Sequence, residues 1–83
     1  MGITDQRSPD LVVVVDGGDT LTVVCNGQAS SYERAKLETA WLLRLEHTNP
    51  MTLAAALRIE HGFSDAIRYA KAADVLVRAG VNI

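Results

Sequence analysis

The sequence is poor in cysteine, proline and aromatic residues. It contains one cysteine, two prolines and four aromatic residues in 83. A single thiol, Cys25, cannot form a disulfide within the chain, so the fold must be held by packing alone. No apolar run approaches the roughly 18 residues of a transmembrane helix, and the first residues do not resemble a secretory signal. We therefore expect a cytoplasmic protein with a small core and no association with membranes.

The sequence also has no strong excess of charge of one sign. Eight basic and ten acidic residues give a net charge of -2 at pH 7, which provides no global attraction to nucleic acid or anionic lipid. With 48% apolar and 22% charged residues, the chain is too hydrophobic to be disordered. Residues 1–9 show no apolar periodicity and are predicted to form a flexible arm. One small domain is expected over residues 10–83.

The first half of this domain has the pattern of a short antiparallel sheet. Leu11 to Val15 is a β-branched run that ends at an Asp-Gly-Gly-Asp turn, and Thr20 to Cys25 alternates between two faces. Asn26-Gly27 is typical of a two-residue hairpin turn, and Gln28 to Ser30 is expected to add a stub of third strand. The sequence predicts a β-hairpin or a short three-stranded meander.

The period of the apolar residues then becomes helical. Ser30 and Glu33 have the form of a capping box, which predicts a helix from about Ser31 to about His47. Asn49-Pro50 ends that helix and begins another, which extends to about Glu60.

A third helix follows a glycine turn. Gly62 is expected to end the second helix in the left-handed conformation, and Ser64 to cap the third, with Asp65 in its first turn. Gly80 is expected to close this helix in the same way as Gly62. The predicted fold class is α+β: a hairpin or meander followed by three α-helices.

The third helix has clearly separated faces. Its apolar side is formed by Ala66, Tyr69, Ala70, Ala73, Leu76 and Val77, and its charged side by Asp65, Arg68, Lys71, Asp74 and Arg78. The charges alternate in sign, with Asp65 and Arg68 three residues apart and Asp74 and Arg78 four apart. We expect this outer stripe to neutralise itself.

A five-residue pattern, Leu-Arg-(Leu or Ile)-Glu-His, occurs twice, ending at His47 and at His61. Two Glu-His pairs are candidates for a metal site or an acid-base pair. A second explanation is that Arg and His near a helix end interact favourably with the helix dipole. Adjacent Glu and His point about 100 degrees apart on a helix, and the interval lacks the HExxH spacing. We favour the helix-end explanation and expect neither a metal nor a cofactor.

No motif indicates catalysis. Cys25 has no nearby base in the sequence and falls in step with Leu21 and Val23, as a small core residue does. Gly17-Gly18 is too short for a phosphate-binding loop, and acidic residues flank it. We therefore expect that the protein is not an enzyme and has no small-molecule substrate.

The segment TLAAALRIEHGFSDAIRYAKAADVLVRAGV, residues 52–81, resembles the helix-turn-helix of winged-helix DNA-binding domains. The shared features are a short alanine-rich helix, a glycine turn, a serine before the next helix and an Ala-Gly-aliphatic ending. The resemblance implies that the helix after Ser64 enters the major groove. It would place Ser64, Asp65, Arg68, Tyr69 and Lys71 near DNA.

The first helix has apolar residues on two sides. One stripe is formed by Leu37, Ala40, Trp41 and Leu45, and the other by Tyr32, Ala35, Leu42 and Leu43. Either this helix is central and is wrapped by its own chain, or one side meets another chain. For the second alternative, we expect Leu37, Trp41 and Leu45 in the core and Tyr32, Leu42 and Leu43 at the protein interface.

The sequence as a whole favours a small non-enzymatic module for protein-protein interaction, most simply a homodimer. Arginine outnumbers lysine six to two and alanine is the commonest residue, as in proteins of GC-rich bacterial or phage genomes. Binding to a host protein would suit such a source. The alternative is a small helix-turn-helix-like DNA-binding protein, for which nucleic acid is the partner, although the charge balance does not favour it.

Overall fold

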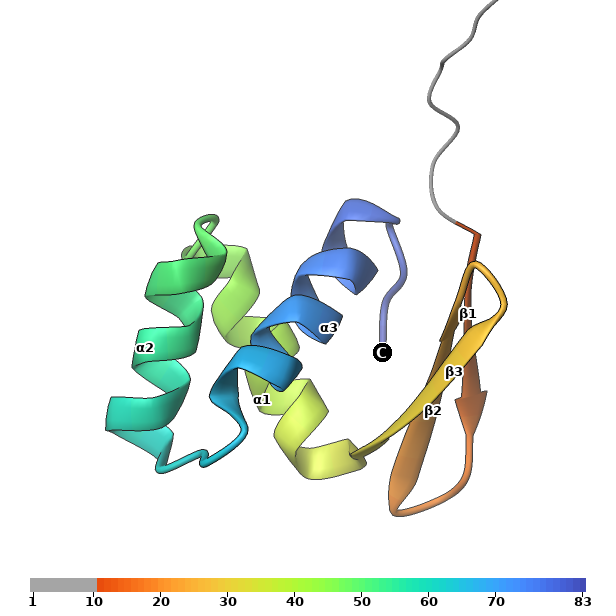
Figure 1. Cartoon of the computed structure of the whole chain (residues 1–83), viewed down its shortest axis with the longest axis horizontal. Coiled ribbons are helices and arrows are strands. Elements are labelled where there is room, and N and C mark those ends of the chain that lie inside the picture. The colour runs from red at the N-terminus through yellow and green to blue at the C-terminus, as the bar shows by residue number, and fades with distance from the viewer. Residues whose placement is uncertain (1–10) are drawn as a thin grey trace, which may run out of the picture.

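Three strands and then three helices make up residues 11–83, which are the residues described by the computed structural model (Figure 1). The elements are β1 (Val12–Asp16), β2 (Thr20–Cys25), β3 (Gln28–Glu33), α1 (Arg34–Glu46), α2 (Pro50–His61) and α3 (Ala66–Arg78). This order confirms the predicted α+β class. The predicted arm at residues 1–9 lies outside the described residues. No helix within residues 11–83 is long and apolar enough to cross a membrane.

The strands form one antiparallel sheet in the order β1-β2-β3. Val14 faces Val23 across the first pair, and Leu21 faces Tyr32 across the second. Asn26 and Gly27 have φ of 52° and 86°, the positive values that a tight hairpin turn requires. The hairpin turn that the sequence predicts is therefore confirmed.

The helices lie on one side of the sheet, and α3 packs against both α1 and α2 (Figure 1). Short alanine side chains let α3 approach its neighbours closely, and α3 has more buried residues than either of the other helices. α3 therefore supplies most of the buried helical surface, while α1 contacts α2, α3 and the strands β2 and β3. The main buried side chains are Leu21, Val23, Leu37, Ala40, Leu53, Leu57, Phe63, Ala66, Tyr69, Ala70, Ala73 and Leu76.

The predicted start of the first helix is wrong by three residues. Ser30 and Ser31 belong to β3, where they face Val23 and Thr22, and the hydroxyls of Thr22 and Ser31 are 3.0 Å apart. The residue at the N-cap is Glu33, and its side chain makes no capping hydrogen bond. Pairing with β2 carries the strand through the residues that would have formed the capping box, and the third strand is therefore longer than the stub expected.

The second helix begins and ends as the sequence predicts. The Asn49 side chain accepts a hydrogen bond from the Met51 N–H at 2.8 Å, and Pro50 is the first helical residue. Gly62 has φ of 70°, and its N–H donates to the carbonyl of Arg58 at 3.1 Å. Each feature satisfies a backbone group that a helix end leaves without a partner.

The start of the third helix differs from the prediction, whereas its end does not. The N-cap residue is Asp65 rather than Ser64, and no side chain caps it, because the Asp65 carboxylate is turned toward Lys36. At the other end, Gly80 has φ of 74°, and the Val81 N–H donates to the Leu76 carbonyl at 2.9 Å. Gly80 therefore ends the helix in the expected way.

The expected core stripe of α1 is only partly correct. Leu37 and Ala40 are fully buried, and Trp41 packs against the core while its indole N–H donates to the Val81 carbonyl at 3.1 Å. Leu45 was expected in the core but is 53% exposed. Within residues 11–83, α1 is covered where it faces α2, α3 and the sheet, and Leu45 lies outside this covered part.

Candidate functional site

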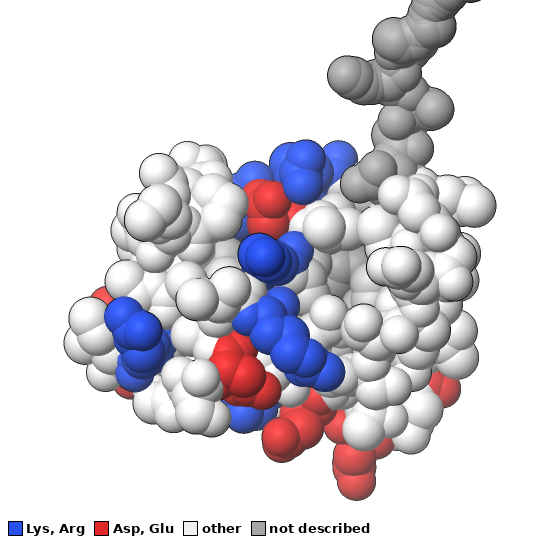
Figure 2. All heavy atoms as spheres, in the orientation of Figure 1, with Lys and Arg blue, Asp and Glu red and all other residues white. Residues whose placement is uncertain are grey.

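The outer side of α3 carries a column of basic side chains between the helices and the sheet, with acidic groups among them (Figure 2). Asp74 bonds to two arginines, Arg44 at 2.8 Å and Arg78 at 3.0 Å. The pair of Arg44 and Asp74 is largely buried, with 11% and 14% of the two side chains exposed. The predicted pairing between Asp74 and Arg78 is therefore present and is reinforced from α1.

The predicted pairing between Asp65 and Arg68 is absent. Asp65 lies 3.3 Å from the Nζ of Lys36, which comes from α1. Arg68 instead places its guanidinium over the ring of Tyr32 at 4.2 Å and donates a hydrogen bond to the Ser31 carbonyl. Arg68 thus connects α3 to β3 through a cation-π contact and a charge-assisted hydrogen bond to a backbone carbonyl.

Tyr69 lies in the core and cannot approach DNA as the helix-turn-helix resemblance implied. Its side chain is 2% exposed, and its hydroxyl accepts a hydrogen bond from the Glu33 N–H at 2.9 Å. Its ring makes edge contacts with Tyr32 and with Phe63, at centroid distances of 5.3 and 5.5 Å. The hydroxyl therefore satisfies the backbone at the point where β3 becomes α1.

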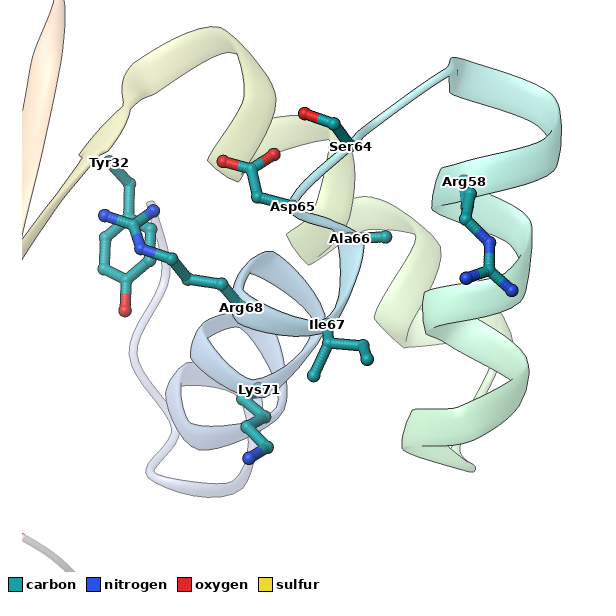
Figure 3. Close-up of a pocket in the computed structure, with 8 residues that line it drawn as sticks. All are labelled: Tyr32, Arg58, Ser64, Asp65, Ala66, Ile67, Arg68 and Lys71. Atoms are coloured by element: carbon teal, nitrogen blue, oxygen red, sulfur yellow. The ribbon is translucent and has the colours of Figure 1, made fainter.

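An open hollow of about 540 Å³ lies between the start of α3, the end of α2 and Tyr32 (Figure 3). Arg68 reaches toward Tyr32, Arg58 extends from α2, and Lys71 points away from both (Figure 3). The three cationic groups do not converge, so the hollow has no preformed position for one anion. Its lining residues are Tyr32, Arg58, Ser64, Asp65, Ala66, Ile67, Arg68 and Lys71.

Two of these cationic groups form no ion pair with an acid in the described part of the chain. Within residues 11–83, Arg58 and Lys71 take part in no ion pair. The nearby acids Asp65 and Asp74 are bound by other basic residues. Arg58 and Lys71 are therefore free to attract an anionic partner, which the alternating charges of the sequence did not indicate.

The residues expected at a protein interface are separated by the fold. Leu42 is 59% exposed on α1, and Leu45 lies one turn further along the same helix. Leu43 is half-buried against the core. Tyr32 is also half-buried, on β3 rather than on the first helix, and lies under Arg68. The open apolar surface of α1 is thus formed by Leu42 and Leu45.

A second open apolar surface lies on the sheet. On the face of the sheet away from the helices, Val13 and Val15 are each about half exposed, and Leu11 beside them is exposed further. Among residues 11–83, β1 is also an edge strand, with β2 on one side only. The sequence signal for this surface is the run of four valines, which provides apolar side chains for both faces of β1.

The hairpin turn between β1 and β2 holds a paired carboxylate. Asp16 accepts a hydrogen bond from the Gly18 N–H at 2.8 Å and forms an ion pair with Arg34. These two interactions, the backbone bond first, lower the pKa of the Asp16 carboxyl below its ordinary value. The only charge of β1 is therefore neutralised within its own chain.

The histidines of the repeated pattern lie at opposite ends of α2. His47 follows the last residue of α1 as its C-cap, and His61 is the last residue of α2. The 12 residues of α2 span roughly 18 Å, so the two imidazoles do not share a site. Among the described residues, no three His, Cys, Asp or Glu side chains are close enough to hold a metal ion. Cys25 is half-buried with a free thiol.

Comparison with known proteins adds no relative. No protein-family model, curated protein or solved structure matches the chain.

Proposed function

We propose that this chain is a non-enzymatic module of the cytoplasm that acts through protein contacts and associates with itself. The observation that carries the proposal is the amount of apolar side chain left open by so small a domain. Eight large hydrophobic residues in the described part of the chain are at least half exposed: Leu11, Val13, Val15, Leu42, Leu45, Met51, Ile59 and Ile67.

The grouping of these residues supports contact with a protein. Single exposed apolar residues are normal, whereas neighbouring ones indicate an interaction surface. Val13 and Val15 lie on one face of β1, with Leu11 just before the strand, and Leu42 and Leu45 are one turn apart on α1. Neither group includes a charged side chain. Both are therefore surfaces that a second apolar surface covers with little cost of desolvation.

Light scattering coupled to size exclusion tests the proposal directly. We expect a mass of at least twice the 9.0 kDa of the chain at micromolar concentration, unchanged after nuclease treatment. A mass of 9.0 kDa at all concentrations, together with failure to retain any protein from a cell extract, would reject it.

A second candidate, duplex DNA binding, is favoured by the unpaired charges of Arg58 and Lys71. These two residues lie on the pair of helices that resembles a helix-turn-helix. Phosphate contacts made by uncompensated basic groups supply most nonspecific affinity for DNA. Against this, the described part of the chain holds most of its other basic groups in ion pairs or against rings.

The variant that tests DNA binding is Arg58→Ala with Lys71→Ala, measured by fluorescence anisotropy on random duplex at about 150 mM salt. Arg68 is left in place because its loss would also loosen α3 from β3. Arg78→Ala is the matched control, since Arg78 is exposed but paired with Asp74. We expect weak binding or none by the wild type. Tight binding that the double variant abolishes and the control retains would make DNA the partner.

A further inference from the structure

We infer that two copies of the chain associate through the outer edge of β1, with the two β1 strands antiparallel and paired at Val14. This inference rests on the proposed function and names the contact through which the chain self-associates.

The two edges of the sheet differ in how they are protected. At the β3 edge, the Ser31 carbonyl accepts a hydrogen bond from Arg68, and the Glu33 N–H donates one to the Tyr69 hydroxyl. Side chains from α3 thus occupy two outward backbone groups of that edge, at Ser31 and Glu33. The outer edge of β1 has no such cover from residues 11–83, and α1 contacts β2 and β3 instead. An open edge strand without Lys or Pro is a template for another strand.

The register of β1 shows which backbone groups are open. At the two ends of the strand, the Asn26 N–H donates to the Leu11 carbonyl and the Gly17 N–H donates to the Thr20 carbonyl. Backbone groups alternate in direction along an antiparallel strand, so Val13 and Val15 also bond to β2. The N–H and C=O groups of Val12, Val14 and Asp16 therefore point outward.

These outward groups are self-complementary. When Val14 of one copy faces Val14 of the other, Val12 faces Asp16 at each end, and about six backbone hydrogen bonds form. The side chains of Val13 and Val15 lie on the sheet face away from the helices. In this pairing, Val13 of one copy faces Val15 of the other across the junction, and such pairs of β-branched residues stabilise sheets. A two-fold axis through Val14 relates the halves, as expected of a homodimer.

Electrostatics do not oppose a second copy in this register. Val12 to Val15 carry no charge, and Asp16 is already bound by Arg34. In the pairing centred on Val14, the two Asp16 residues are four positions apart along the junction, or about 14 Å. This separation exceeds the Debye length of about 8 Å in physiological salt, so the two acids do not repel each other appreciably.

The test is a proline at position 14. Val14→Pro removes an outward N–H and places a ring in the path of the second strand, without removing a bond from β1 to β2. Ala29→Pro is the control for an edge proline, because it puts the same residue on the outer edge of β3, at an exposed position, whereas Val14 is half-buried against the core. Circular dichroism therefore reports whether loss of the Val14 side chain alone disturbs the fold. Leu42→Glu tests the competing surface on α1. The mass of each variant is measured by light scattering, and its fold by circular dichroism.

We expect a dimeric wild type, a folded Val14→Pro protein of 9.0 kDa, and dimers for Ala29→Pro and Leu42→Glu. A folded Val14→Pro dimer would overturn the inference but leave the proposed self-association standing. Leu42→Glu alone giving a monomer would assign the contact to α1. A monomeric wild type would reject self-association and, with it, the pairing of β1 strands.

Amide hydrogen exchange of the wild type decides the matter if Val14→Pro does not fold. The Val14 amide should exchange slowly in concentrated solution and at least tenfold faster on dilution, whereas the Val13 and Val15 amides should stay protected in both. Equal exchange of the Val14 amide at both concentrations would overturn the inference.

Discussion

Arg68 and Tyr69, two neighbours in sequence, serve different purposes because α3 points them in different directions. Arg68 reaches the ring of Tyr32 and the Ser31 carbonyl, while Tyr69 points inward and binds the Glu33 N–H. Both contacts join α3 to β3. Residues that a motif would assign to DNA binding thus hold the helical layer on the sheet, and this is why Arg58 and Lys71 are the better probes of nucleic-acid binding.

The Asp16 carboxyl gives a prediction about a single residue. We predict that its pKa lies below the ordinary range and that Arg34→Gln raises this pKa. The bond from the Gly18 N–H remains in the variant, so the pKa of Asp16 returns only part of the way to its ordinary value. A carboxyl whose pKa is lower in the folded state stabilises the fold above the unfolded pKa of about 3.9 and loses that effect as pH falls through the folded value. The stability difference between wild type and Arg34→Gln should therefore shrink below pH of about 4. NMR titration of the Asp16 carboxyl measures the shift, and an identical pKa in both proteins would contradict it.

Helix α1 shows how an element can be apolar on two sides without being enclosed. Its inner side packs through the buried Leu37 and Ala40, and the helix contacts α2, α3 and the sheet. Leu42 and Leu45 remain open on the outer side. The question of whether α1 is wrapped by its own chain is thus answered for its inner side only, and the outer leucines stay available for contact.

This difference between the two sides of α1 predicts unequal effects of the same truncation. Leu37→Ala removes a fully buried side chain and should cost about 2 to 5 kcal/mol of unfolding free energy. Leu45→Ala, on the exposed side, should change it by less than about 0.5 kcal/mol. Urea unfolding of dilute protein measures both values. Similar costs for the two variants would mean that Leu45 is buried, as the sequence pattern had indicated.

For the whole molecule, the open edge of β1 and the apolar side chains beside it have a consequence for stability. A folded state that binds a second copy is stabilised by mass action, whereas the unfolded state is not. The melting temperature should therefore rise as protein concentration rises over about two decades. Calorimetry or circular dichroism measures this dependence. A constant melting temperature for the wild type, together with a constant one for Val14→Pro, would be the behaviour of a monomer.

Four turn and helix-end signals that act within one turn of chain are read correctly from the sequence, whereas the two serine caps are not. Asn26-Gly27, Asn49-Pro50, Gly62 and Gly80 each act on backbone groups a few residues away, and the structure places each as predicted. The apolar side of α3 is likewise buried as its periodicity indicates, apart from Val77, which is half-buried. Local geometry is sufficient for these features, because hydrogen bonding and side-chain direction within one element do not depend on distant segments.

Features that depend on distant partners were decided only by the tertiary structure. Ser30 and Ser31 joined a strand because β2 pairs with them, and Asp65 turned to Lys36 rather than to Arg68. The candidate contact surface at the outer edge of β1 also depends on distant partners. Four valines indicated a strand, but only the hydrogen bonds from α3 to Ser31 and Glu33 showed that the β3 edge is the protected one. Pairing, burial and exposure are set by what the fold brings alongside a residue, and a pattern along the chain does not contain that information.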